Sequence, residues 1–157
     1  YLPSNGIIQG IRPLIGYNYG AGERKRVEQI YRLTLELTAG IMAAGTALCW
    51  LIPGGMIGLF TENPETITIG ITALHIISLG FILSAVSVTS SGAMEALGQG
   101  MASLVISVMR YVAVVIPAAF VLSRIIGVTG VWWAFVCTES VTAVVAYVLY
   151  HRVWKRA

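Results

Sequence analysis

The residues that decide the fold are Gln9-Gly-Ile-Arg-Pro-Leu-Ile-Gly-Tyr-Asn-Tyr-Gly-Ala-Gly-Glu-Arg-Lys-Arg26. The stretch begins apolar, becomes aromatic and rich in glycine, and ends in a cluster of charged residues. This order is typical of the end of a membrane helix, a tight turn and a basic loop. Because basic loops stay on the cytoplasmic side, this loop predicts which side of the membrane each later helix faces.

The composition also indicates a membrane protein. Of the 157 residues, 57% are apolar and only 11% are charged, and the mean hydropathy is +0.81. Soluble domains carry about 25% charged residues. Segments 37–61 and 66–94 contain no Asp, Glu, Lys or Arg, and about 20 apolar residues suffice for a helix to cross a bilayer. We therefore expect the lipid bilayer as a partner and no nucleic acid, although the net charge is +3.

We predict an all-α, polytopic transmembrane helix bundle, made of the end of one helix and four full spans. The predicted spans are 1–22, 27–53, 74–94, 101–123 and 131–150. Segments 58–65 and 124–130 are predicted loops, and the first of them has room for a short interfacial helix. Asn63 or Thr61 is a suitable cap for the following helix, with Pro64 at its first position. Since the chain starts inside a helix, we expect it to be part of a larger protein.

The distribution of basic residues predicts the orientation. If the loop after the first helix is cytoplasmic, seven basic residues lie inside and one, Arg124, lies outside. This imbalance agrees with the positive-inside rule and places the C-terminus in the cytoplasm of a multi-pass protein of the cell (inner) membrane. The seven are Arg24, Lys25, Arg26, Arg32, Arg152, Lys155 and Arg156.

Two arginines remain within the predicted spans. A charge at the centre of a bilayer costs at least about 2.5 kcal/mol, so it normally pairs or faces water. Residues at similar depths are candidate partners, which predicts the intramembrane ion pairs Arg12–Glu36 and Arg110–Glu139. Each pair either holds helices together or contains a carboxylate that binds a proton or cation during transport.

Enzymatic chemistry is not indicated by the remaining polar residues. His75 and His151 are far apart, and no HExxH or GxSxG motif is present. Cys49 and Cys137 lie in apolar runs without a CxxC motif, which argues against a metal site and a disulfide framework. We expect a protein that is not an enzyme and has no cofactor other than a coupling ion.

The opening stretch resembles the eighth helix and following loop of multidrug and toxic compound extrusion (MATE) transporters. Ala93-Met-Glu-Ala-Leu-Gly-Gln-Gly100 resembles the end of the tenth helix, and Arg110 with Pro117 resembles the eleventh. Gly127-Val-Thr-Gly-Val-Trp-Trp-Ala-Phe135, with Glu139, resembles the approach to the twelfth helix and its acidic position. The resemblance covers essentially the whole chain.

The resemblance implies a twelve-helix antiporter of two lobes, in which this chain is most of the second lobe. It implies export of cationic, amphipathic drugs in exchange for Na⁺ or H⁺, and it requires an N-terminal lobe as partner. One branch of the family carries an acidic cation-site residue in the tenth helix, where this chain has Ser84. The chain therefore resembles the DinF-like branch, in which the coupling carboxylate lies in the other lobe, and both the coupling ion and the coupling residue stay open.

Seven residues are candidates for lining a substrate cavity, although packing or turn formation also explains each of them. They are Gln9, Arg12, Tyr17, Asn18, Ser84, Ser87 and Glu139. Two alternatives to drug antiport remain open, a lipid-linked oligosaccharide flippase of the same superfamily and a structural membrane protein. A flippase would need a large cationic cavity.

Overall fold

The computed structural model describes residues 2–156, without the side chain of Arg156. Tyr1, where the first predicted span begins, therefore lies outside the described residues, as does one side chain of the basic tail. The described chain forms the helices α1 (Leu2–Gly20), α2 (Arg24–Leu51), α3 (Pro53–Gly58), α4 (Pro64–Ala96), α5 (Gly100–Val108), the π-helix η1 (Met109–Val115), α6 (Ile116–Ile126) and α7 (Val128–Arg156).

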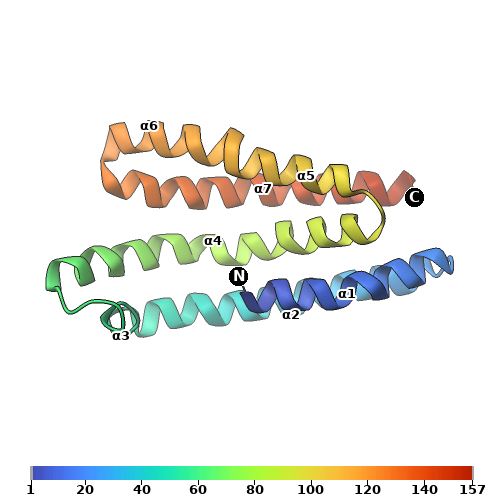
Figure 1. The fold of residues 1–157 in the computed structure, drawn as a ribbon, viewed down its shortest axis with the longest axis horizontal. Coiled ribbons are helices and arrows are strands. Elements are labelled where there is room, and N and C mark those ends of the chain that lie inside the picture. The colour runs from blue at the N-terminus through green and yellow to red at the C-terminus, as the bar shows by residue number, and fades with distance from the viewer. Residues whose placement is uncertain (1, 157) are drawn as a thin grey trace.

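Among the described residues, four helical stretches are long and apolar enough to cross a membrane, namely Arg24–Leu51, Pro64–Ala96, Gly100–Ile126 and Val128–Lys155. The predicted all-α, polytopic bundle is thus confirmed. In Figure 1 the long helices lie side by side, with α1 and α2 on one side of α4 and α5, α6 and α7 on the other. The α1–α2 turn, the α4–α5 turn and the C-terminus lie at one end of the bundle, and α3 lies at the other.

Helix α4 is the centre of the bundle, because it packs against α1, α2, α3, α5 and α7. Its buried positions are mostly small or hydroxyl-bearing, which lets neighbouring helices come close. Gly92 shows how close: a Cβ added there would lie 2.2 Å from Cγ2 of Ile8 on α1. Only glycine fits at this crossing.

Apolar side chains also cover the outer surface, where a soluble protein would carry polar ones. On α2 the exposed residues Leu33, Leu37, Ile41 and Leu48 recur at helical spacing and form a stripe. From α5 to α6 the exposed residues Val108, Val112, Ile116 and Phe120 recur every four positions. Lipid chains cover such stripes without cost, so both faces fit a multi-pass membrane protein.

Helix α4 begins at the residue that the capping signals in the sequence predict. The side chain of Asn63 accepts hydrogen bonds from the backbone N–H groups of Glu65 and Thr66, and Pro64 is the first helical residue. The helix therefore begins ten residues before the predicted span 74–94. The short helix, in contrast, is not in 58–65 but at 53–58, because Pro53 starts a new helix at once after α2 ends.

The predicted loop at 124–130 is wrong, because α6 continues to Ile126 and α7 begins at Val128. Gly127 alone makes the turn, with φ 68° and ψ −150°, a conformation open almost only to glycine. Gly130 then lets α7 pass the backbone of α6: a Cβ there would lie 2.1 Å from the carbonyl oxygen of Leu122.

The span that contains Arg110 and Pro117 includes the π-helix η1. Pro117, one residue into α6, has no N–H to donate to the carbonyl four residues earlier, and its ring crowds that carbonyl. A wider helical turn before the proline relieves this crowding. Arg110 lies within η1 and is buried, although most of its neighbours in the same helix are exposed or half-buried.

Candidate functional site: a buried ion pair and a polar cavity

Arg110 and Glu139 form an ion pair inside the bundle, as the sequence predicts. Nη2 of Arg110 lies 3.5 Å from Oε2 of Glu139, and only 10% and 11% of the two side chains are exposed. The same guanidinium nitrogen donates a hydrogen bond to Oγ of Ser87 on α4. The pair thus connects η1, α7 and α4 at a level that lies within the membrane-spanning stretches.

Gly80 of α4 makes room for this carboxylate. A Cβ at Gly80 would lie 3.3 Å from Cγ of Glu139 and 3.5 Å from its Cβ. Because the α4 backbone therefore passes directly beside Glu139, a larger residue there would displace the acidic side chain. The glycine and Arg110 together hold the carboxylate in place from two different helices.

The predicted pair Arg12–Glu36 is wrong. Arg12 of α1 instead pairs with Glu95 of α4, with Nη2 2.5 Å from Oε2. Glu36 accepts a hydrogen bond from Nε of Arg32, its neighbour one turn earlier on α2, and both of these side chains are mostly exposed. Arg12 thus has a carboxylate partner, but on a different helix from the one expected.

The prediction fails because two residues at equal depth need not face each other: Glu36 is mostly exposed on α2 and contacts Arg32 of the same helix. The α1–α2 hairpin reaches farther along the bundle than the α4–α5 turn (Figure 1). Arg12, eight residues before the end of α1, consequently lies beside Glu95, the second-last residue of α4. Glu95 therefore lies at the level of Arg12, although the two residues differ in their distance from the ends of their helices.

A hydrogen-bonded chain extends from Glu95. Oγ of Ser103 on α5 donates to Oε1 of Glu95 at 2.5 Å, and the hydroxyl oxygens of Ser103 and Ser91 are 2.5 Å apart. With Arg12, these contacts join α1, α4 and α5 near the α4–α5 turn. The Glu95 carboxylate therefore has a charged partner on one oxygen and a hydroxyl on the other.

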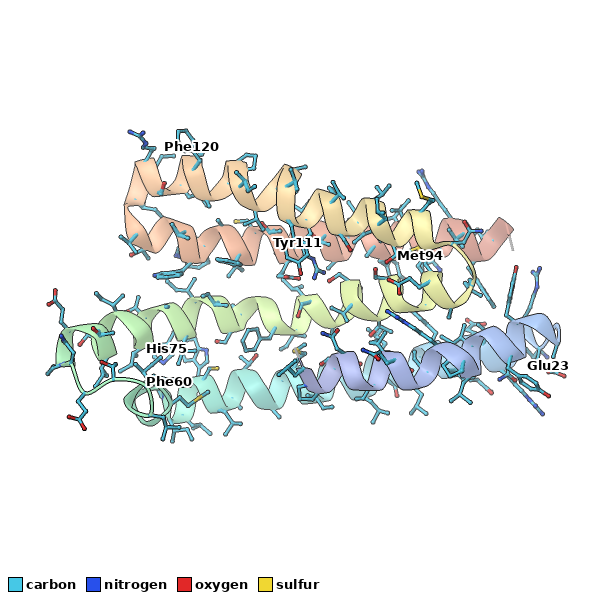
Figure 2. The ribbon with its side chains drawn as sticks, viewed as in Figure 1. Glu23, Phe60, His75, Met94, Tyr111 and Phe120 are labelled. Carbon is cyan, nitrogen blue, oxygen red and sulfur yellow. The ribbon has the colours of Figure 1, made fainter. Side chains whose placement is uncertain are left out.

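The Arg12–Glu95 pair and Arg110 line a common polar cavity of about 140 Å³. It lies between α1, α4, α5 and η1, and Figure 2 marks its Tyr111 near the middle of the bundle, between the ends marked by Glu23 and Phe60. Most of its lining is polar or charged: Asn5, Arg12, Ser87, Ser91, Glu95, Ser107, Arg110 and Tyr111, with Ile8, Val88, Gly92 and Ile106.

A second cavity, of about 130 Å³, adjoins the first through Arg110 and Tyr111. Glu139 and Thr138 of α7 provide its other polar groups, and Val115 and Phe135 complete it. The Arg110 side chain therefore stands between a polar cavity and a more aromatic one that contains the acidic residue.

The predicted cavity residues separate into two groups. Arg12 and Ser87 line the polar cavity, and Glu139 lines the second one. The other four, Gln9, Tyr17, Asn18 and Ser84, line neither. Asn18 donates to the carbonyl of Leu14 on its own helix, and Ser84 donates to that of Phe81. Gln9 and Tyr17 are exposed on α1.

Sequence reasoning missed Glu95, Ser91 and Ser103 as parts of the site. A signal was present, because Ser87, Ser91 and Glu95 follow one another at intervals of four and so share one face of a helix. Ser103 carried no comparable signal, since its contact with Glu95 depends on how the α4–α5 turn folds back.

Comparison with known proteins finds multidrug export proteins among those that this chain resembles. The MatE family profile matches residues 1–121. The multidrug export protein MepA of Staphylococcus aureus (strain MSSA476) is 25% identical over 144 residues, which are 92% of this chain and 32% of MepA. MepA of Staphylococcus saprophyticus is 24% identical over the same coverage. The chain thus spans about a third of the length of the curated relatives it matches.

Solved structures agree in fold. The MATE multidrug transporter DinF-BH, solved in complex with R6G, is 31% identical with a TM-score of 0.87, over 96% of this chain and 34% of DinF-BH. An inward-facing MATE transporter of the MOP superfamily is 21% identical, with a TM-score of 0.93 over 99% of this chain and 36% of its own. At that identity the second likeness concerns the fold alone.

Proposed function

Since this chain belongs to the MatE family, we propose that the whole protein is a secondary active antiporter that exports cationic or amphipathic drugs in exchange for Na⁺ or H⁺. The chain provides most of one lobe, and the other lobe of the same protein is its partner. The protein lies in the cell (inner) membrane, with the basic 23–26 loop and the C-terminal tail in the cytoplasm.

The observation that carries the proposal is the Arg110–Glu139 pair, with its hydrogen bond to Ser87, inside membrane-spanning helices. Ionisable residues within spans are costly and typically mark ion or substrate pathways. A polar cavity of about 140 Å³ lies directly beside this pair. A structural membrane protein would need neither a cavity nor a buried carboxylate, so these features favour transport.

The absence of an acidic residue at Ser84 supports placement in the DinF-like branch, as does the 31% identity to DinF-BH. A flippase for lipid-linked oligosaccharides is the second candidate. It is less well supported, because both arginines at the polar cavity are paired with carboxylates, Arg12 with Glu95 and Arg110 with Glu139. The charges of the two pairs cancel, and a cavity for anionic lipid phosphates calls for excess positive charge.

The test uses the full-length protein, reconstituted in proteoliposomes with a fluorescent organic cation. A Na⁺ gradient and a proton gradient are imposed separately, and dye movement is followed. We expect movement under at least one gradient and none without a gradient. Dye that moves equally well without any gradient, or does not move at all, would contradict antiport and make sugar-lipid flipping the next activity to measure.

Two variants make the result specific to this lobe. Glu139→Gln removes the buried charge and keeps the shape of the side chain, and we expect it to abolish gradient-driven movement. Glu36→Gln removes an exposed charge whose contact is with Arg32 on the same helix, so it serves as the matched control. Equal dye movement in both variants would show that Glu139 takes no part in coupling.

A further inference from the structure

We propose that the C-terminal end of α7 is a binding site for an anionic phospholipid, with the phosphate in a basic pocket and an acyl chain along a stripe of valines. The inference goes beyond the proposed antiport and takes from it only the orientation, which places the site in the cytoplasmic leaflet. It is based on a pocket, on positive charges outside the salt bridges and on exposed apolar residues, all of which lie on one helix.

The pocket has a volume of about 200 Å³ and lies where the membrane-spanning stretch Val128–Lys155 ends. In Figure 1 this end of α7 is at the same end of the bundle as the α1–α2 and α4–α5 turns. The lining combines two cations, two aromatic rings and one apolar side chain, namely Tyr147, Val148, His151, Arg152 and Lys155. Cationic and aromatic residues at the end of a span are typical of the level of the lipid headgroups.

Arg152 and Lys155 bring positive charge into this pocket, and the pocket has no acidic residue in its lining. Both side chains are exposed. Neither takes part in the four salt bridges that the described residues form, whose cations are Arg12, Arg26, Arg32 and Arg110. The pocket at the end of α7 therefore carries excess positive charge, which an anion can neutralise.

The acidic residue Glu28 of α2 acts on the opposite face of α7. Its charge interacts with Tyr150, which is buried and stacks on Tyr31. Tyr150 is two residues from both Val148 and Arg152, which is about 200° around a helix of 3.6 residues per turn. The face that packs on α2 is therefore distinct from the face that carries the pocket.

A phosphate group is the anion that these side chains suit. The planar guanidinium of Arg152 can donate two parallel hydrogen bonds to phosphate oxygens, and the ammonium of Lys155 adds a compact positive charge. His151 provides a ring N–H donor. Its ring contacts those of Tyr147 and Tyr150, with centroid distances of 4.3 and 5.6 Å, so the imidazole has a fixed position beside the two cations.

A stripe of valines favours a phospholipid over free phosphate. Val141, Val144 and Val148 recur at helical spacing, and 45%, 65% and 42% of each residue is exposed. Since Val148 also lines the pocket, the stripe leads from the cations toward the middle of the membrane-spanning stretch. An acyl chain attached to the bound phosphate would lie along this stripe, whereas a free phosphate ion gains nothing from it. Basic pockets at the cytoplasmic side of membrane helices bind anionic headgroups in this way.

The test uses the full-length protein in a neutral detergent, with phosphatidylglycerol that carries a photoactivatable group on its acyl chain. After irradiation, mass spectrometry of the peptides locates the cross-links. We expect cross-links in segment 141–155 that unlabelled phosphatidylglycerol removes and that phosphatidylcholine or inorganic phosphate at the same concentration does not. Cross-links that are missing from this segment, or that phosphatidylcholine removes equally well, overturn the proposal. Removal by inorganic phosphate shows a site for free anions and overturns the assignment to a lipid.

Two double variants test the charges. Arg152→Gln/Lys155→Gln should weaken the apparent affinity for phosphatidylglycerol in segment 141–155 by about tenfold or more. Arg26→Gln/Arg32→Gln removes the same charge from residues that already pair with carboxylates, so it is the matched control and should change the affinity by less than about twofold.

Equal losses in the two double variants would show attraction by overall charge and overturn the site. The exchange Arg152→Lys/Lys155→Arg keeps both charges and should retain most of the binding, and gel filtration checks that each variant is folded. Cross-linking requires neither a gradient nor dye movement. A negative result therefore leaves antiport standing, and a failure of antiport leaves the lipid site standing.

Discussion

At the scale of single residues, two glycines of α4 determine how closely other helices approach. Gly92 faces Ile8 of α1, and Gly80 faces Glu139 of α7. Neither glycine makes an unusual turn, since both lie within the regular helix α4. Their role is to leave space for the side chains of Ile8 and Glu139. The backbone conformation of the two glycines gives no sign of this role, because it is ordinary α-helix.

Substitution of Gly92 should separate α1 from α4. We expect Gly92→Ala to lower the stability of the full-length protein by about 1–3 kcal/mol, because Ile8 is buried and cannot yield. Thermal unfolding in detergent measures this. The double variant Gly92→Ala/Ile8→Ala should recover part of the loss, and Gly40→Ala, which meets no atom within 4 Å, is the control. Equal effects of Gly92→Ala and Gly40→Ala would contradict the close contact.

The corrected ion pair gives a second prediction at this scale. Glu95→Gln should destabilise the protein by about 1–2 kcal/mol, because it leaves the Arg12 charge without its carboxylate partner. Glu36→Gln should change stability by less than about 0.5 kcal/mol, since its partner is an exposed residue on the same helix. The exchange Arg12→Glu/Glu95→Arg should restore part of the loss. A larger loss of stability in Glu36→Gln than in Glu95→Gln would contradict the Arg12–Glu95 pair and favour the pair Arg12–Glu36.

At the scale of elements, the α6–α7 connection depends on one residue. Gly127 turns the chain between two membrane helices without a loop, and Gly130 allows the second helix to pass Leu122. A loop was expected at 124–130, a segment that contains both of these glycines. The structure uses the same glycines for close packing, because two helices that meet at a single residue must also cross closely.

Gly127→Ala should therefore disturb the turn between α6 and α7. The φ of 68° with ψ of −150° is strained for any residue with a Cβ, at a cost of about 1–3 kcal/mol. We expect a lower unfolding temperature and faster proteolysis at the turn. Gly55→Ala, in a helix and with no atom within 4 Å, is the control and should have little effect. A Gly127→Ala protein as stable as the parent would show that the turn adopts another backbone conformation.

At the scale of the whole molecule, an aromatic cluster joins helices from both sides of α4. The rings of Tyr31 on α2 and Tyr150 on α7 stack at 4.0 Å, and the Tyr31 hydroxyl is 2.9 Å from that of Ser90 on α4. Three helices thus meet in one buried contact. Trp154 extends the stack along α7 toward the basic tail.

Removal of a single oxygen tests this junction. Tyr31→Phe keeps the stacked ring and loses the buried hydrogen bond to Ser90, so we expect a loss of about 0.5–1.5 kcal/mol. Tyr31→Ala should cost about 3–5 kcal/mol, because it leaves a cavity between the helices. Tyr17→Phe, at a side chain that is 79% exposed, should be neutral. Thermal unfolding of the full-length variants provides the measurement, and a neutral Tyr31→Ala would exclude the junction.

The sequence by itself determined the helical membrane architecture, the start of a helix at Pro64 and the pairing of Arg110 with Glu139. These features follow from local rules, because apolar length, capping chemistry and the cost of a buried charge act within one helix or between adjacent ones. The tertiary structure alone decided that Arg12 meets Glu95 and that Ser103 joins them. That outcome depends on how far each helical hairpin extends along the bundle. Helix packing determines this distance, and the number of residues between a side chain and a turn does not predict it.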